Sequence, residues 1–262
     1  MSVSRIPLIV STLLTAHLIG CASASATQLP EHTIMRAAGP ITIDGVIDEP
    51  SWGAAAAVGD FHFPWWTEGD KEQTAARLLW DDQNLYISFV ADDKHISAIH
   101  KDRDAAVSQD DCVEAFVMPD TTNIGHYYNF EVNVIGTMLD RFQLSEPTGA
   151  YTSELSAATV IDGTLNDESD EDVGFVTEFA IPFGSFVDTA PNLPPKPGDT
   201  WRLNLYRIGG KVNPQYSQWS NTGTPKPKYH VPERFGIVHF SGDVIEVKAV
   251  AAPMKNQEPE TK

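Results

Sequence analysis

Apolar and polar residues alternate along residues 127–134, where the sequence reads YYNFEVNV. Successive side chains of a β-strand point to opposite faces, so a period of two predicts a strand here. One face would be apolar and suited to a core, with Tyr128, Phe130, Val132 and Val134. The other would gather hydrogen-bonding groups, with Tyr127, Asn129, Glu131 and Asn133. Amides and carboxylates fixed on a strand suit a sugar rich in hydroxyl groups, although a covering loop would explain the same pattern.

Similar patterns predict strands along most of the chain and very little helix. Residues 75–80 and 85–91 flank the turn DDQN at 81–84, which predicts a hairpin. Further strands are expected at 41–43, 112–118, 137–144, 175–181, 201–208 and 235–240. The proline in DEPSW at 48–52 favours the start of a short helix. Together these elements predict an all-β fold, an antiparallel β-sandwich with short helical turns in its loops.

The two ends of the chain differ from this strand-rich middle. Arg5 and a mainly apolar stretch at 6–19 are typical of an export signal, and the stretch is too short for a permanent membrane helix. The sequence LIGC at 18–21 resembles a lipoprotein cleavage motif, which would leave Cys21 lipidated at the mature N-terminus. The alternative site, ASA at 24–26, would release a secreted protein without an anchor.

These features predict the organisation of the whole chain. We expect a signal peptide at 1–20, or cleavage near 26, and then a flexible lead at 21–36. No linker or repeat divides the middle, so we expect one domain at 37–245 and a disordered tail at 246–262. The mature protein would reside at the cell envelope, as an outer-membrane lipoprotein or in the periplasm.

Composition narrows the class of partner. The formal net charge of -18 argues against binding to nucleic acid or anionic lipid through a basic patch, so a lipid anchor would be the only membrane contact. The chain has two cysteines, Cys21 and Cys112, so an internal disulfide is not expected after export. Cys112 falls in an apolar strand and is expected to be a buried, inert thiol. We expect a monomer.

Seven motifs, taken in order, resemble those of carbohydrate-binding module family 9 and its close relatives. They are DGVIDEPSW at 44–52, LWDDQNLY at 79–86, DDCVEAF at 110–116, FEVN at 130–133, EFAIP at 178–182, WS at 219–220 and PERFG at 232–236. The resemblance implies a non-catalytic β-sandwich that binds polysaccharide or oligosaccharide in support of glycan breakdown. In the family, two tryptophans clamp a sugar ring while a carboxylate, an arginine and amides hold its hydroxyl groups.

The resemblance also implies roles for particular residues. By position, Trp219 resembles one clamp tryptophan, Glu114 the carboxylate and Asn133 an amide. Two positions depart from the family pattern. Ser108 stands where the second tryptophan would be, and Glu131 stands where the arginine would be.

Other residues could complete such a site. Trp65 and Trp66 are adjacent in a loop, which predicts either core packing or a stacking platform for a sugar. Arg207 shares strand parity with apolar residues, and we expect it to end that buried face and point into a groove. The expected substrate-binding residues are therefore Trp219, Glu114, Asn133, Glu131, Arg207, Trp65 and Trp66.

Three alternatives stay open. Glu114 and Glu131 could act as acid and base of a glycoside hydrolase, although no catalytic residue is assigned and a binding module is favoured. The sandwich could instead be a structural or protein-interaction domain that has lost the sugar site. No cofactor is expected, but Asp162, Asn166 and Asp170 lie in an acidic stretch that is either a solvated loop or an irregular calcium site.

Overall fold

The computed structural model describes residues 28–144, 151–186 and 189–247. The predicted signal peptide, Cys21 and residues 248–262 lie outside these ranges. The strands are β1 Glu31–Arg36, β2 Thr74–Trp80, β3 Asn84–Asp92, β4 Cys112–Met118, β5 Tyr127–Asn133, β6 Met138–Gln143, β7 Ser156–Asp162, β8 Gly174–Pro182, β9 Thr200–Ile208, β10 Tyr216–Gln218 and β11 Gly236–Val244. Helical turns are short: α1 Pro50–Ala54, η1 Val107–Gln109, η2 Phe183–Phe186 and η3 Pro232–Arg234.

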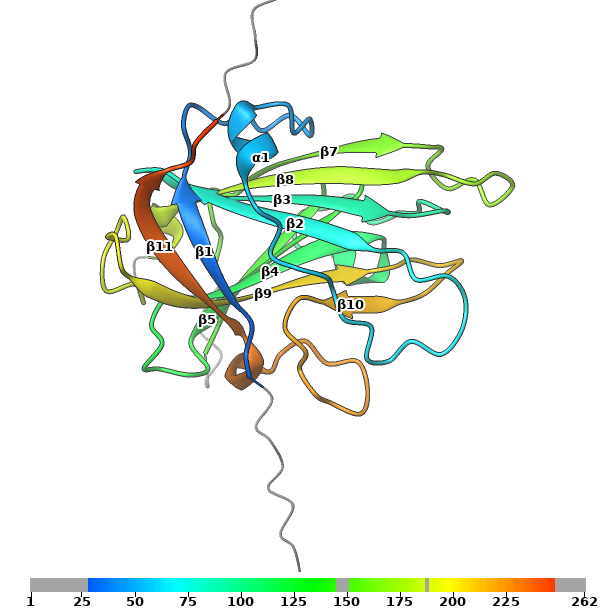
Figure 1. Cartoon of the computed structure of the whole chain (residues 1–262). Helices are drawn as coiled ribbons and strands as arrows, with labels where there is room; N and C mark the ends of the chain where they lie inside the picture. Colours follow the sequence, from blue (N-terminus) through cyan, green and yellow to red (C-terminus); the bar gives the residue numbers. More distant parts are fainter. Residues whose placement is uncertain (1–27, 145–150, 187–188, 248–262) are drawn as a thin grey trace, which may run out of the picture.

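The strands form two facing layers that are joined along one side (Figure 1). Hydrogen bonding follows the order β6-β5-β4-β9-β11-β1-β2-β3-β8-β7, and β10 pairs with β9. One layer holds β6, β5, β4, β9 and β10, the other holds β2, β3, β8 and β7, and β11 with β1 connects them. The predicted β-sandwich is confirmed. Its sheet is mixed rather than purely antiparallel, because β1 runs parallel to both β11 and β2.

The core lies between the layers, because each strand turns alternate apolar side chains inward. The inward residues of β5 are those predicted from the alternation, and they pack with Val113, Ala115 and Val117 of β4. The opposite faces of β4 and β5 point away from this core and carry Glu114 and Glu131. These two strands therefore offer one face to the main core, and the other face buries the two carboxylates beside a second apolar cluster that includes Phe116 and Tyr127.

Most predicted strands are present, and the hairpin between β2 and β3 closes as expected, with the Asp81 amide donating to the Asn84 carbonyl at 3.1 Å. Residues 41–43 form no strand, whereas β7 and β10 were not predicted. The flexible lead expected at 21–36 is wrong for residues 31–36, which form β1. Ile34 of β1 is fully buried, so this segment belongs to the folded domain.

β1 carries the chain from one end of the sandwich to the other. The Ile237 amide donates to the Pro30 carbonyl at 2.9 Å, which places the entry to β1 beside η3. At the far end, the Ile245 amide donates to the Arg36 carbonyl at 2.9 Å. In Figure 1 the described chain accordingly starts at the bottom, near η3, and leaves at the top, near α1.

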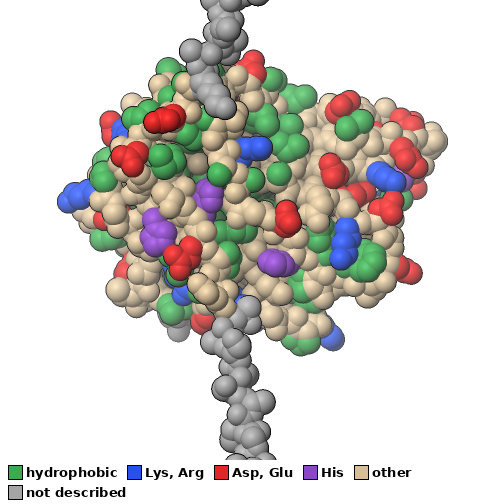
Figure 2. Space-filling model, viewed as in Figure 1, with side chains coloured by type: hydrophobic (Ala, Val, Ile, Leu, Met, Phe, Trp, Pro, Cys, Tyr) green, Lys and Arg blue, Asp and Glu red, His purple; other side chains and the backbone are tan. Residues whose placement is uncertain are grey.

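Many acidic side chains lie on the surface of the protein (Figure 2). Acidic side chains are spread over the face shown in Figure 2, most densely at its right-hand end. Within the described residues, no helix has the length and apolar character needed to cross a membrane.

Candidate functional site

A hollow of about 310 Å³ lies on the outer face of β4, β5 and β9. We call it the carboxylate hollow, and its lining residues are Ser108, Glu114, Phe116, Glu131, Ile208, Tyr216, Pro227, Lys228, Tyr229 and His230. Glu114 and Glu131 face each other because the register of β4 and β5 pairs them directly. Directly opposed residues in an antiparallel pair have Cβ atoms about 4.5–5.5 Å apart. The structure therefore brings these two carboxylates face to face in the hollow.

The two carboxylates are buried and incompletely hydrogen-bonded. Glu114 is 3% exposed and Glu131 is 7% exposed. The amide of Asn129 donates to Glu131 Oε1 at 2.7 Å, while Glu114 Oε1 has only the Cys112 thiol at 3.8 Å. Burial, and then repulsion by Glu131, raises the pKa of Glu114 well above its ordinary value. Burial also raises the pKa of Glu131 to about 7.

Aromatic rings from the sheet and from the loop before η3 form a wall beside the carboxylates. The ring of Phe116 lies 4.9 Å from that of His230, and the ring of Tyr229 stacks on Tyr206 at 4.0 Å. The loop that carries Tyr229 is fixed to the sheet, because the Tyr206 hydroxyl donates to the Tyr229 carbonyl at 2.9 Å. The Tyr229 hydroxyl in turn donates to the Arg207 carbonyl at 2.9 Å. The aromatic wall is thus held in place before any ligand binds.

A second depression adjoins the carboxylate hollow and shares Tyr216 and Pro227 with it. We call it the tryptophan groove, because Trp65 and Trp66 line it. Trp65 is partly buried, packs against Tyr229 at 6.0 Å and donates from Nε1 to the Thr224 carbonyl at 2.7 Å. Trp66 is 41% exposed. Each tryptophan therefore matches a different predicted role. Trp65 mainly packs against other side chains, whereas Trp66 exposes its ring to solvent.

Trp219 does not line the hollow. Its side chain is 2% exposed within the core, and Nε1 donates to the Val58 carbonyl at 2.8 Å. Gly236 covers the ring so closely that a Cβ added there would lie 2.4 Å from it. A ring enclosed in this way has no face for a sugar, so the expected stacking role of Trp219 is corrected to a core role.

Asn133 shares a strand face with Glu131, but structural hydrogen bonds use its amide. Its Nδ2 donates to Asp110 Oδ2 at 2.7 Å and to the His100 carbonyl at 2.9 Å. Its Oδ1 accepts from the Thr137 amide at 2.8 Å. Asn133 therefore fixes the turn after β5 and the segment before β4, and it is not among the residues that line the carboxylate hollow.

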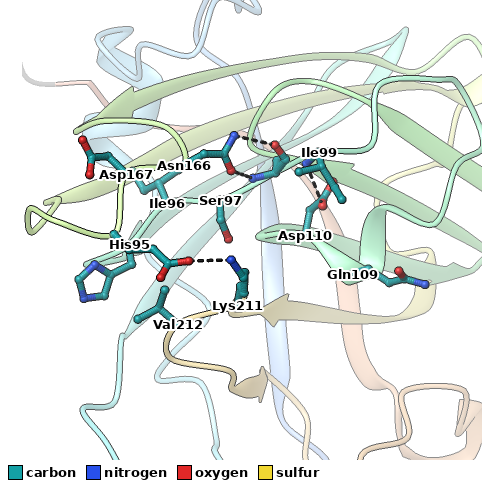
Figure 3. A pocket seen from close by; sticks show the side chains of 12 residues that line it. His95, Ile96, Ser97, Ile99, Gln109, Asp110, Asn166, Asp167, Lys211 and Val212 are labelled. Atoms are coloured by element: carbon teal, nitrogen blue, oxygen red, sulfur yellow. Dashed lines mark hydrogen bonds and ion pairs between the residues drawn. The ribbon is translucent and has the colours of Figure 1, made fainter.

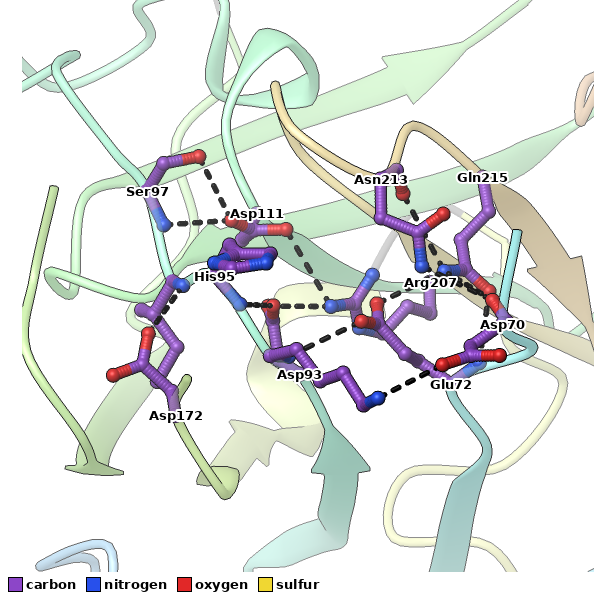
Figure 4. A network of polar contacts seen from close by, with 12 residues as sticks. Asp70, Glu72, Asp93, His95, Ser97, Asp111, Asp172, Arg207, Asn213 and Gln215 are labelled. Atoms are coloured by element: carbon purple, nitrogen blue, oxygen red, sulfur yellow. Dashed lines mark hydrogen bonds and ion pairs between the residues drawn. The ribbon is translucent and has the colours of Figure 1, made fainter. Parts of the chain in front are cut away.

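Arg207 points into the sandwich, away from Glu114. It pairs in register with Val113 of the core face, and its guanidinium contacts Asp93 at 2.6 Å and Asp111 at 3.4 Å (Figure 4). Asp93 follows β3 of the other layer, so this buried cluster ties the two layers together. Burial raises the pKa of Asp111 to about 7, although Arg207 opposes that rise. The prediction that Arg207 ends the buried face is confirmed, but it does not point into the ligand groove.

Another hollow, of about 380 Å³, opens between the loops at one end of the sandwich (Figure 3). Most of its polar groups already have partners among the described residues, although the buried Nδ1 of His95 has none there. The amide of Asn166 exchanges hydrogen bonds with the backbone of Ala98 at 3.0 Å, and Lys211 pairs with Glu168 at 2.7 Å. Asp110 accepts from the amides of Ile99 and His100. Few groups remain here to recognise a ligand, so the carboxylate hollow is the better candidate despite its smaller volume.

The acidic stretch at 162–172 covers the end of β7 and most of the loop that leads to β8. Asp162 ends β7, and Asn166 spends its side-chain amide on Ala98. Within the described residues, no three His, Cys, Asp or Glu side chains gather as a metal site. The predicted calcium alternative therefore gains no support from the arrangement of Asp162, Asn166 and Asp170.

Sequence reasoning missed most of the aromatic wall. Phe116 could have been found, since it lies two residues after Glu114 and so shares its strand face. Tyr206 becomes a neighbour of Glu114 only through the pairing of β4 with β9, which joins strands far apart in sequence. Tyr216 and Tyr229 come from loop-proximal segments whose position no periodic pattern gives.

Comparison with known proteins identifies a family for this chain and proteins with the same fold. The family model for carbohydrate-binding family 9 matches residues 61–240. Among curated proteins, no sequence matches the chain.

Solved structures share the fold at low sequence identity. A proposed carbohydrate-binding protein from Bacteroides uniformis ATCC 8492 matches with a TM-score of 0.70 and 20% identity, over 82% of this chain and 100% of that chain. A carbohydrate binding module family 9 from Caldicellulosiruptor kristjanssonii, in complex with cellotriose, matches with a TM-score of 0.58 and 16% identity, over 85% of this chain and 100% of that chain. The same kind of module in complex with glucose gives a TM-score of 0.57 and 16% identity, over 83% and 98% of the two chains.

Proposed function

The chain belongs to carbohydrate-binding family 9, and we propose that it binds a poly- or oligosaccharide in the carboxylate hollow. One observation carries the proposal: two buried carboxylates with unused acceptor capacity lie beside a fixed aromatic wall in a single hollow. Sugars present hydroxyl groups around an apolar ring face. Carboxylates accept hydrogen bonds from the hydroxyls, while aromatic rings cover the ring face.

The wall also suggests how this chain manages without the family's paired tryptophans. Ser108 lines the hollow where a tryptophan is missing, and Trp219 lies in the core. Tyr216 is 38% exposed on the rim, and Phe116 and Tyr229 lie beside the carboxylates. We assign the stacking role to Tyr216, because Phe116 and Tyr229 are 1% and 8% exposed and form the buried lining beside the carboxylates.

The tryptophan groove extends the proposed site beyond a single sugar. It shares Tyr216 and Pro227 with the carboxylate hollow, so a chain leaving the hollow would pass directly over Trp66. The ammonium of Lys71 lies 4.6 Å from the centroid of the Trp66 ring. This continuity favours an oligosaccharide or polysaccharide over a free monosaccharide.

Glycan binding by the purified protein tests the function. A glycan array followed by titration calorimetry on the best hit should give saturable binding. Tyr216→Ala and Glu114→Gln should each weaken it about ten-fold, the equivalent of ~1.4 kcal/mol. Ile99→Ala serves as the control, because Ile99 lines the separate hollow of about 380 Å³ between the loops. This variant should leave the affinity unchanged. An empty array, or binding unaffected by both site variants, would reject the proposal.

We further propose that the protein is exported and held at the cell envelope, where it would retain glycan for separate degrading enzymes. The support is the signal-like sequence at 1–20 and the lipoprotein-like motif ending at Cys21. The acidic composition fits an exported binding domain that does not adhere to anionic lipid.

A further inference from the structure

The charge of the carboxylate hollow is unusual for a site that binds a neutral sugar. Like charges placed directly opposite on neighbouring strands destabilise a sheet, yet Glu114 and Glu131 occupy such positions. Among the ion pairs of the described residues, none involves either carboxylate. Glu114 is nine-tenths buried, lines the hollow and has only a thiol contact. The two carboxylates of the hollow therefore have no built-in counterion among the described residues.

The charged neighbours do not remove this imbalance. Lys228 lines the hollow but is exposed and makes no ion pair with the carboxylates. Arg141 on β6 lowers the pKa of Glu131, yet burial outweighs it and the net shift is upward. His230 is hydrogen-bonded to the Tyr127 hydroxyl at 2.7 Å. Cys112, Tyr206 and Tyr229 also lie against the pair, but they are neutral acids and cannot supply a positive charge.

We propose that the carboxylate hollow selects a saccharide that carries a protonated amine, such as an amino sugar. This inference rests on the proposed function and narrows its substrate class. An ammonium group has three donors and no acceptor, so it suits two carboxylates that lack donors. A neutral hydroxyl would satisfy only part of that capacity and none of the charge.

The aromatic wall strengthens the case for a cation. Ring faces attract cations within about 6 Å of the centroid, and the attraction grows when the cation is desolvated. Tyr216 is 38% exposed and lines the same hollow as the carboxylates. An ammonium group between the carboxylates and this ring would therefore gain from both.

The protonation state of the pair gives a second observable. Because burial raises the pKa of Glu131 to about 7 and the pKa of Glu114 well above its ordinary value, the free hollow holds protons near neutral pH. Binding of an ammonium favours the ionised form of both carboxylates. A proton then leaves the pair for the buffer, while the ammonium keeps its own.

Titration calorimetry with three matched probes tests the inference. The probes are trimers of β-1,4-linked glucosamine, of N-acetylglucosamine and of glucose, each titrated near neutral pH in two buffers that differ in ionisation heat. We expect the glucosamine trimer to bind at least ten-fold more tightly than the two neutral trimers, with proton release. The neutral trimers should release no protons.

Variants assign the preference to the pair. Glu131→Gln should weaken binding of the glucosamine trimer about ten-fold more than it weakens binding of the glucose trimer. Asp48→Asn is the matched control, because it removes the same charge near α1, on the outer face of the opposite layer. It should leave the preference unchanged, which excludes general attraction to an acidic protein. Thermal melts of each variant verify that it is folded.

Each outcome bears on a different statement. Equal or tighter binding of the neutral trimers overturns the amine preference and leaves the proposed sugar-binding function standing. A preference that survives Glu131→Gln, or that falls equally in Asp48→Asn, overturns its assignment to this pair. Absence of binding to all three trimers and to a glycan array overturns the proposed function and the inference with it.

Discussion

At the scale of single residues, the opposed carboxylates have a cost that the fold must offset elsewhere. A buried acid whose pKa is raised binds protons more tightly in the folded state than in the unfolded state. Its contribution to stability is present at low pH and is lost as pH rises through the folded-state pKa. For Glu131, that interval runs from its ordinary 4.5 to about 7.

The first prediction concerns this pH dependence. Glu131→Gln removes the titration, so the stability of the wild-type protein relative to the variant should fall between about pH 5 and about pH 8. The expected change is on the order of 1–3 kcal/mol, since one pKa unit corresponds to about 1.4 kcal/mol. Urea unfolding of both proteins at several pH values measures it. Parallel stability curves would show that Glu131 titrates normally.

Single residues also show how far sequence reasoning reached. Alternation gave the polar face of Glu131 and the family resemblance gave the role of Glu114, whereas the register that opposes the two is known only from the structure. The burial of Trp219 depends on Gly236 and on the distant Val58 carbonyl, contacts that arise only when separate strands pack. A tryptophan next to a polar serine looks the same in the sequence whether it is enclosed or exposed.

At the scale of elements, β1 determines whether the two layers close. It pairs with β11 on one side and β2 on the other, and Ile34 is buried in the core. Its sequence, EHTIMR, has no regular alternation, so local pattern could not reveal it. Strands with strong alternation or a clear turn, such as β5 and the hairpin of β2 and β3, were predicted.

A truncation tests the role of β1. A chain that starts at residue 37, the predicted domain boundary, should fail to give a cooperative unfolding transition, because the edges of β11 and β2 lose their partner. In the full-length protein, Ile34→Ala should cost about 2–5 kcal/mol. Thr33→Ala, on the exposed side of β1, should cost under ~0.5 kcal/mol. Normal folding of the truncated chain would show that β1 is dispensable.

One of the motifs that resemble the family has a structural role in the fold. The segment DGVIDEPSW is fastened to β8 through Glu178, which accepts from the Gly45 amide at 2.9 Å and from Trp52 Nε1 at 2.8 Å. This motif and EFAIP, which contains Glu178, therefore hold each other on the outer face of the opposite layer. They identify the fold, whereas the ligand site depends on β4, β5 and the loop before η3.

At the scale of the whole molecule, the buried Arg207 cluster and the seam at β1 leave little freedom between the layers. Arg207 in one layer contacts Asp93 of the other, and β1 joins the layers along the side. The carboxylate hollow is built on one layer and its adjoining loops. We therefore expect the site to be formed in the free protein, without movement of one layer against the other.

The proposed anchor has a direct test in the host cell. Cys21→Ser should abolish labelling by a radioactive fatty acid and move the protein from the membrane to the soluble fraction. Cys112→Ser is the control, since Cys112 is buried in the fold and should not affect labelling. A mature protein that begins after Ala26, established by mass spectrometry, would instead identify a freely secreted form.

The entry of the chain beside η3 constrains how an anchored protein would stand. Gln28 is the seventh residue after Cys21, and a fully extended chain of seven steps reaches about 25 Å. The carboxylate hollow is bounded by the loop that runs into η3. A short tether from Cys21 would therefore keep the opening of the hollow at the membrane-proximal end of the protein. Such a protein would catch fragments passing close to the bilayer, and would have little reach toward material farther out.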